Sequence, residues 1–268
     1  MNTNSNTYTV IYSTILVVVV AAVLAFAATS LKEKQEENVK VDTISQILDA
    51  AGIKYNEGNV LQVYRDNIKE AILVDFDGNP CKEDLDEQNC DIYTTSQLKE
   101  QTVADEADKK LPVYIFKNDV TVVPCYGAGL WGPIWGYIGV NKDLTISKAC
   151  FGHKGETPGL GAKITDQPDV FADNFANKTI TTKIPVEKNG KDQANGVDTI
   201  SGATITSSAA GKMVNKWLGF YQAYFKAEEQ PCCTDCQECC GACGAEGEMC
   251  PEECLETAEE VAVEKSNN

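Results

Sequence analysis

The chain of 268 residues has a single histidine, His153, and few basic residues. Its 23 lysines and arginines are outnumbered by 40 aspartates and glutamates, which gives a formal net charge of −17 at pH 7. One histidine excludes metal centres built from several histidines and argues against a Ser-His-Asp hydrolase triad. We expect no nucleic-acid partner, because binding nucleic acid requires a basic face.

Charge is also absent from the first 31 residues, where residues 9–28 are almost entirely apolar. Twenty helical residues span about 30 Å, the thickness of a bilayer core. A cleaved signal peptide is the alternative, and Ala25-Phe26-Ala27 resembles a cleavage site. Signal peptides have a basic leading region and a shorter apolar run, which this chain lacks. We therefore predict a short tail at residues 1–8 and a retained transmembrane helix at residues 9–29.

The lysines nearest to the apolar run, Lys32 and Lys34, both follow it. By the positive-inside rule, this order would place the rest of the chain in the cytoplasm. The signal is small, since three glutamates lie among these lysines and long domains cross membranes largely regardless of charge. The residues alone leave the orientation open.

Between residues 30 and 227 the pattern predicts one α+β domain. Apolar residues recur at helical spacing up to Gly52, and residues 59–69 resemble a second short helix. Ser207 is a suitable N-cap for a last helix that runs towards Lys226. Because strands and helices do not alternate regularly, we expect a mainly antiparallel twisted sheet with flanking helices. The predicted strands are residues 72–76, 113–116, 120–123, 134–140, 144–146 and 179–186. Residues 81–106 are predicted to be a polar, exposed insertion.

The most informative stretch is the turn Ser201-Gly202-Ala203-Thr204, with Asp198 upstream and the predicted helix downstream. Two small residues between two hydroxyls give a mobile turn with an accessible threonine at a helix entrance. Helix entrances favour phosphate groups, because free N–H groups and the positive end of the helix dipole point there. Thr204 could also hold a phosphate covalently. The alternative is that this turn only caps the helix of an assembly scaffold.

Two further stretches combine glycine with residues suited to a planar ligand. In the glycine-rich run 152–163, Glu156 and Thr157 could hydrogen-bond ring heteroatoms, and Leu160 could pack on a ring face. The run 126–137 places aromatic residues beside glycines, which also suits a planar cofactor. The alternatives are an ordinary turn-rich connection for the first run and a bend with core tryptophans for the second.

Taken together, these three stretches resemble the motifs of a known family. The turn Asp198-x-x-Ser201-Gly202-Ala203-Thr204 looks like the motif that flavin transferases modify. Residues 156–161 and 129–137 look like the other two signatures of the FMN-binding domain family. With the anchor included, the chain is similar to the NqrC subunits of the Na⁺-translocating NADH:quinone reductases as far as about Lys226. The G subunit of the related Rnf ferredoxin:NAD⁺ electron transport complex is the closest alternative, and the sequence of residues 129–135 favours NqrC.

The resemblance implies FMN joined to the Thr204 hydroxyl through a phosphoester, and a large domain on the outer side of the cytoplasmic (inner) membrane. It implies an electron carrier between the redox centres of partner subunits, with NADH oxidation and sodium transport on those partners. The cofactor-binding residues that it implies are Ser201, Gly202, Ala203, Thr204, Asp198, Glu156, Thr157, Leu160, Gly161, Lys188 and Trp131. Asp198 is expected to assist the flavin transferase. Lys188 matches a basic family position near the flavin, with an ordinary exposed turn lysine as the alternative.

The composition changes at residue 228, where we expect a flexible, acidic, cysteine-rich tail up to residue 268. Cys233, Cys236, Cys239 and Cys243 match the spacing of a ferredoxin cluster, but Gly244 stands where such runs have proline. Outside the cytoplasm, disulfides or unordered thiols are expected ahead of a metal or a cluster. A membrane-tethered metal-binding protein acting through this tail is a further alternative. Cys81 and Cys90 could bridge a loop, and Cys125 and Cys150 are expected to be buried thiols.

Overall fold

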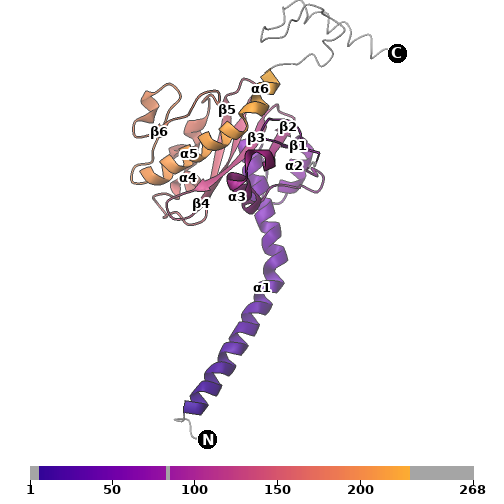
Figure 1. Ribbon diagram of the computed structural model, residues 1–268, viewed down its shortest axis with the longest axis vertical. Helices are drawn as coiled ribbons and strands as arrows, with labels where there is room; N and C mark the ends of the chain where they lie inside the picture. The colour runs from indigo at the N-terminus through magenta and orange to yellow at the C-terminus, as the bar shows by residue number, and fades with distance from the viewer. Residues whose placement is uncertain (1–5, 83–84, 230–268) are drawn as a thin grey trace, which may run out of the picture. The chain divides into compact units, whose positions relative to one another are not determined.

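The computed structural model describes residues 6–82 and 85–229 (Figure 1). A compact unit ends at Lys226, close to the predicted start of the acidic tail. The eight cysteines of that tail, including Cys233, Cys236, Cys239 and Cys243, lie outside the described residues. The state of the tail therefore stays a prediction.

A five-stranded antiparallel sheet forms the centre of the domain, with the strands side by side in chain order. This sheet confirms the predicted α+β class. Its strands are β1 (Ile68–Val74), β2 (Leu111–Phe116), β3 (Thr121–Ala128), β4 (Pro133–Val140) and β5 (Ile146–His153). A small parallel pair, β6 (Val186–Glu187) and β7 (Val197–Asp198), stands apart from it.

Helices cover both faces of the sheet. They are α1 (Asn6–Ala50), α2 (Val60–Asn67), α3 (Thr95–Val103), α4 (Lys163–Asp166), α5 (Thr204–Phe220) and α6 (Gln222–Glu229). Four short 3₁₀ turns complete the fold: η1 (Glu106–Asp108), η2 (Pro168–Val170), η3 (Ala172–Phe175) and η4 (Gly190–Asp192). The predicted helix at residues 59–69 is confirmed by α2, which gives way to β1 at Ile68.

The cross-strand register places α5 and α1 on opposite faces of the sheet. Gly127 of β3 lies against the Met213 side chain of α5, and its partner Ile134 on β4 points to the same face. Side chains alternate along a strand, so Trp135 and Gly139 point to the other face. There the backbone of Gly139 abuts Ala50 of α1. The core therefore lies in two layers, one under each helix.

Helix α1 has two parts with different surroundings. Its apolar N-terminal part is exposed, and it is the one helix among the described residues that is long and apolar enough to cross a membrane. Its last turns are buried in the domain core, with Ile44, Ile47 and Leu48 fully covered. The same helix thus serves both as the apolar segment and as part of the domain's core (Figure 1).

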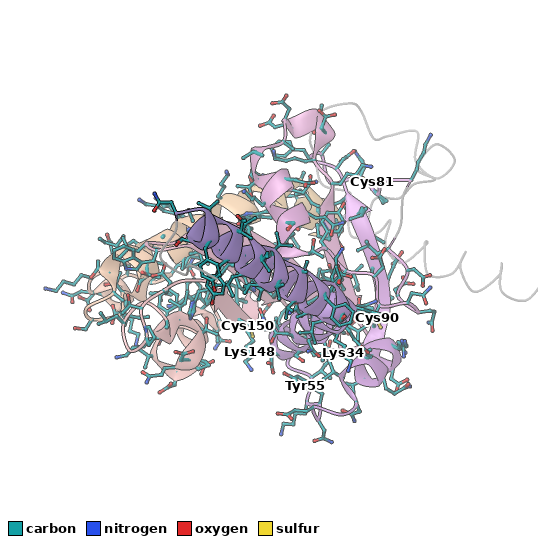
Figure 2. The ribbon with its side chains drawn as sticks, turned by 90° about the horizontal axis from the view of Figure 1, so that it is seen from below. Lys34, Tyr55, Cys81, Cys90, Lys148 and Cys150 are labelled. Atoms are coloured by element: carbon teal, nitrogen blue, oxygen red, sulfur yellow. The ribbon has the colours of Figure 1, made fainter. Side chains whose placement is uncertain are left out.

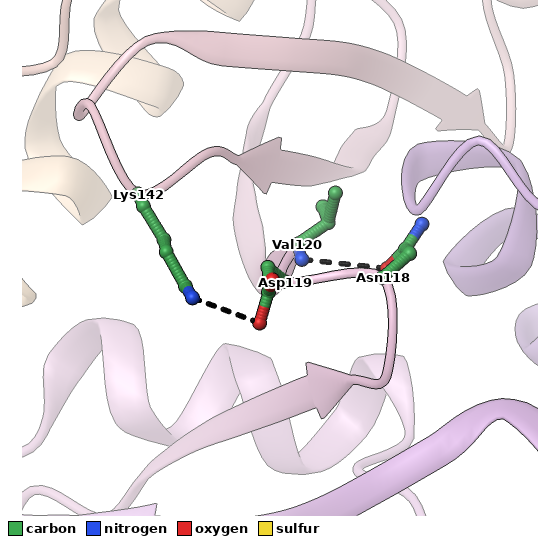
Figure 3. A network of polar contacts seen from close by, with 4 residues as sticks. All are labelled: Asn118, Asp119, Val120 and Lys142. Carbon is green, nitrogen blue, oxygen red and sulfur yellow. Dashed lines mark hydrogen bonds and ion pairs between the residues drawn. The ribbon is translucent and has the colours of Figure 1, made fainter.

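The end of the sheet near α1 is closed by two turns that contact each other. Lys142, between β4 and β5, pairs with Asp119, between β2 and β3, at 3.1 Å (Figure 3). Asn118 accepts a hydrogen bond from the Val120 backbone and donates one to Ala51 O at the end of α1. Because β3 runs away from these turns, the 128–133 loop lies at the opposite end of the sheet.

The prediction of a polar, exposed segment at residues 81–106 holds for most of its described residues, but the segment also has structure and buried residues that were not predicted. The segment contains α3, which starts with a Thr94–Gln97 capping box and packs against β3. The sequence did not reveal the buried residues of this segment, because its few apolar residues are irregularly spaced among many polar ones and show no helical or strand periodicity. The buried members are Leu85, Cys90, Ile92, Tyr93 and Leu98.

The predicted strand at residues 179–186 is wrong for most of its length: Thr179 forms an isolated antiparallel bridge with Thr145, and Val186 belongs to β6. In this segment, asparagine side chains supply partners for the backbone of Thr179 and Ile184. Asn195 accepts from Thr179 N and donates to Thr179 O, and Asn215 does the same for the backbone of Ile184. The β-branched residues therefore lie in irregular backbone.

Ser207 is not the N-cap of the last helix, because α5 starts earlier, at Thr204, with Ala203 in the cap position. Ser207 is instead buried within the first turn. Its hydroxyl accepts from Ile200 N at 3.0 Å and donates to Ala203 O at 2.9 Å. The helix also breaks at Tyr221 before α6 begins.

Of the described cysteines, Cys90 and Cys125 are buried and Cys81 and Cys150 are half-buried; Figure 2 labels Cys81, Cys90 and Cys150. Cys90 is a buried free thiol, so the Cys81–Cys90 bridge that the sequence allowed is not formed. Cys125 is buried as predicted, and burial raises the pKa of its thiol. Cys150 is half-buried, and burial, with a smaller effect of Asp49, raises the pKa of its thiol to about 12.

Candidate functional site

Hydrogen bonds on its buried side hold the turn at residues 201–204 in one conformation. Ala203 N donates to Ile200 O at 2.9 Å, and the Ser207 hydroxyl closes the turn on its inner side. Gly202 has a φ of +81°, a conformation that disfavours side chains. Ser201, Gly202 and Thr204 are exposed, whereas Ala203 is buried. The structure therefore presents the Thr204 side chain to solvent at the first position of α5.

The N-terminus of α5 is open. Its cap residue, Ala203, has no side chain that could accept a hydrogen bond from the first turn. The first N–H groups of a helix have no intrahelical partners, so they are available to an external acceptor. Next to the Thr204 hydroxyl, these groups suit a phosphate.

A groove of about 560 Å³ begins at Thr204. One wall is formed by residues spaced four apart on one face of α5, namely Thr204, Ser208, Lys212 and Lys216. The other wall consists of residues 126–128 at the end of β3, together with Thr102 of α3. This volume is within the usual range for cofactor sites, about 300–1,000 Å³.

Several large apolar side chains of the two glycine-rich loops and of α5 are exposed. Trp131 is 69% exposed and Leu160 is 45% exposed, although both are large. Leu130 and Ile205 are likewise exposed. Leu160 reaches the turn itself, because a Cβ added at Gly202 would lie 3.1 Å from its side chain. The structure thus brings Leu160 to the turn, whereas neither Leu160 nor Trp131 is among the residues that line the groove.

Glu156, predicted from the sequence to lie beside the ring, is buried and forms hydrogen bonds to two other segments. Its side chain is only 4% exposed. Its carboxylate accepts hydrogen bonds from Trp131 N at 3.0 Å and from the Thr206 hydroxyl at 2.7 Å. The next residue, Thr157, is exposed, and its carbonyl accepts from Leu160 N and Ala162 N, which fixes the loop. Gly161 is buried against the Glu156 carboxylate.

Asp198 and Lys188 lie in the segment before the turn. Asp198 is half-buried at the end of β7, and its carboxylate accepts from Lys191 N at 3.0 Å. Lys188 is exposed beside Asn189, and it lines neither the groove at Thr204 nor a second groove on the other side of α5. The structure therefore does not bring Lys188 to the groove.

Two lysines of the groove were missed by the sequence reasoning. Lys216 donates to Thr102 O at 3.2 Å and lies 5.6 Å from the Phe220 ring centroid. Lys212 is exposed and lines both grooves. The signal that could have revealed both is their spacing of eight and twelve residues from Thr204, which places them on one helix face.

The described residues contain no group of three or more His, Cys, Asp or Glu side chains arranged to hold a metal ion. The site is an uncapped helix N-terminus beside a partly apolar groove. Such a site can hold a phosphorylated planar molecule.

Comparison with known proteins agrees with this geometry. A model of the FMN-binding domain family matches residues 129–219, which include Trp131, Glu156 and Thr204. The chain is 32% identical over 225 residues to the C subunit of the Na(+)-translocating NADH-quinone reductase of Vibrio alginolyticus, and the match covers 76% of this chain and 87% of that protein. It is 28% identical to the same subunit of Haemophilus ducreyi, with 83% and 95% covered.

Solved structures show the same similarity. The crystal structure of the C subunit of the Na(+)-translocating NADH-quinone reductase from Parabacteroides distasonis matches with a TM-score of 0.62 and 34% identity. That match covers 73% of this chain and 96% of that chain. The crystal structure of Shewanella oneidensis NqrC matches with a TM-score of 0.57 and 25% identity, covering 72% and 99%.

Proposed function

Because the chain belongs to the NqrC family of the Na⁺-translocating NADH-quinone reductases, we propose that Thr204 carries its FMN through a phosphoester bond. The chain is an FMN-carrying electron-transfer subunit of that oxidoreductase complex, and its partners are the other subunits. The observation that supports the attachment site is the position of Thr204. Its exposed side chain stands at the first position of α5, where the groove begins.

The residues around Thr204 fit this cofactor. The open N–H groups of α5 would hold the phosphate, and the groove would border the rest of the molecule. The apolar faces of Trp131 and Leu160, with the exposed Thr157, would limit the access of water to the ring. FMN, when bound, supplies the redox chemistry by accepting electrons from one centre and passing them to the next.

Attachment requires a turn that a flavin transferase can reach. Ser201, Gly202 and Thr204 are exposed and the side chains here are small, so the turn can enter another protein's active site. Asp198, which precedes the turn in the chain, would assist the flavin transferase by contacting it. In the finished protein, the same carboxylate holds Lys191 N and shapes the preceding loop.

The apolar part of α1 is proposed to anchor the chain to the cytoplasmic (inner) membrane as a single span, over about residues 9–29. The FMN-binding domain then occupies residues 30–227, with the tail at residues 228–268, and lies on the outer side of the membrane. Covalent attachment makes sense on that side, since a soluble cofactor that dissociated there would be lost. Protease accessibility in intact cells, compared with inverted vesicles, tests the orientation.

The experiment that tests the function is the intact mass and peptide map of the membrane-extracted protein, made together with its flavin transferase. We expect one FMN adduct, on the peptide that contains Thr204. Thr204→Val keeps the shape but lacks the oxygen, so it should abolish in-gel flavin fluorescence after denaturation. Thr165→Val, which changes an exposed threonine elsewhere, is the matched control and should keep the fluorescence. A fluorescent valine variant rules out Thr204 as the attachment site.

A further inference from the structure

The carboxylate of Glu156 connects three segments that are far apart in the sequence. Glu156 follows β5, Trp131 belongs to the loop between β3 and β4, and Thr206 lies in the first turn of α5. Oε1 accepts from Trp131 N at 3.0 Å, and Oε2 accepts from the Thr206 hydroxyl at 2.7 Å. Thr206 is 1% exposed and Glu156 is 4% exposed. Hydrogen bonds to a charged acceptor are stronger than neutral ones, so this contact is a firm link.

Two glycines make room for this carboxylate. A Cβ added at Gly129 would lie 2.4 Å from Oε1 of Glu156, and one added at Gly161 would lie 2.4 Å from Oε2. Neither glycine has a positive φ, so backbone conformation does not explain them. Space explains them, because any side chain at either position would displace the Glu156 carboxylate.

We propose that Glu156 is a positioning residue for the flavin, and that it acts by linking the Trp131 loop to the first turn of α5. This inference rests on the proposed attachment of FMN to Thr204. Thr204 and Thr206 share one helical turn, so a tie at Thr206 fixes the direction in which Thr204 points. The same tie fixes the backbone of Trp131, whose side chain is exposed.

The geometry argues against direct contact between Glu156 and the flavin ring. Each carboxylate oxygen already has a protein donor, and almost none of the side chain reaches the surface. The functional effect of Glu156 is therefore the fixed spacing of the two groups that it holds. When the Trp131 loop and the first turn of α5 are held at a fixed spacing, the flavin has one environment and hence one reduction potential.

The first test needs no flavin and uses the full chain made without the transferase. We expect Gly161→Ala to lower the melting temperature, because its Cβ would collide with Oε2. In a Glu156→Ala background the same change should lower it less, since the colliding oxygen is gone; part of the loss persists because Oγ1 of Thr206 would lie 2.9 Å from the Cβ. Gly219→Ala, with no atom near its Cβ, is the control and should have equal effects in both backgrounds. Equal effects of Gly161→Ala in both backgrounds would overturn the link.

The second test uses the flavin-loaded protein. Glu156→Gln keeps an acceptor for Trp131 N and a partner for the Thr206 hydroxyl, whereas Glu156→Ala removes both. We expect the alanine variant to shift the reduction potential and to raise native flavin fluorescence, and the glutamine variant to restore both towards the parent values. Thr206→Val, which removes one donor, should give a smaller shift in the same direction. All variants should show equal fluorescence after denaturation, because attachment is unaffected.

The outcomes separate this inference from the proposed function. A glutamine variant that behaves like the alanine variant assigns the effect to the charge, and it overturns positioning. An unchanged potential in the alanine variant overturns it as well. If the coupling between Glu156 and Gly161 is found but no flavin is attached at Thr204, the link stands and the proposed function fails.

Discussion

Trp135 of β4 donates its indole N–H to Oε1 of Gln46 on α1, at 3.0 Å. The two residues are 89 positions apart in the chain. Gly152 on the neighbouring β5 leaves room for this ring, because a Cβ there would lie 2.4 Å from the indole. The strand that follows the Trp131 loop is therefore joined to the helix that begins as the apolar segment.

Gln46→Met should weaken the docking of α1, because the indole N–H of the half-buried Trp135 would lose its acceptor. A lost hydrogen bond of this kind lowers the free energy of unfolding by about 1 kcal/mol. Tryptophan fluorescence during urea unfolding in detergent measures it. Gln62→Met on α2 is the control, since its amide contacts only Asp66 of its own exposed helix face. Equal effects of the two substitutions would contradict the assignment.

Gly139→Ala should destabilise the domain, because its Cβ would lie 2.1 Å from the carbonyl oxygen of Ala50. Backbone cannot move aside cheaply, and overpacking costs about 1–3 kcal/mol. Gly219→Ala should instead stabilise the domain. Gly219 lies near the end of α5 with open space around it, and alanine favours helix by up to about 1 kcal/mol. Calorimetric melting of both variants checks the pair, and a stable Gly139→Ala variant contradicts the close contact.

Lys212→Gln should lower the flavin reduction potential, because a positive charge near the flavin favours its anionic reduced form. Lys212 lines the groove that begins at Thr204, two helical turns further along α5. Lys188→Gln, in which a lysine outside both grooves is changed, should leave the potential nearer to that of the parent. Spectroelectrochemical titration compares the two variants. A larger shift of the reduction potential in Lys188→Gln than in Lys212→Gln would instead support the place near the flavin that the family resemblance implies for Lys188.

The Cys150 thiol should resist alkylation in the folded protein. Burial, aided by Asp49, raises the pKa of this thiol to about 12, so at pH 8–9 it forms less thiolate than an unperturbed cysteine does. The thiolate is the reactive form, and the folded state therefore slows modification at these pH values. Peptide mass mapping after labelling in native and denaturing conditions measures the difference. Rapid native labelling of Cys150 would contradict this burial.

The sequence predicted those elements whose own residues carry the signal. The β-branched and apolar runs around residues 113–123 and 134–140 became β2, β3 and β4, because period and turn residues agree there. The segment at residues 179–186 misled, because the backbone of Thr179 and Ile184 is satisfied by the side chains of Asn195 and Asn215. Those partners lie 16 and 31 residues away, and no local pattern reports them.

The sequence likewise predicted some parts of the site and not others. The Thr204 turn is visible in sequence because small residues and hydroxyls are contiguous. The role of Glu156 is not, since its partners Trp131 and Thr206 are 25 and 50 residues distant. The motif suggests a ligand contact at Glu156, whereas the fold uses this residue to join the other two motifs.

Helix α1 also determines where the globular part could be shed by a protease. Buried side chains begin at Thr43, and residues 31–38 are exposed on all sides. A cut between Lys32 and Lys34 would separate the globular domain from the apolar segment and leave the interior of the domain complete. A cut only a few turns later would remove Ile44, Ile47 and Leu48 and leave the sheet uncovered on one side.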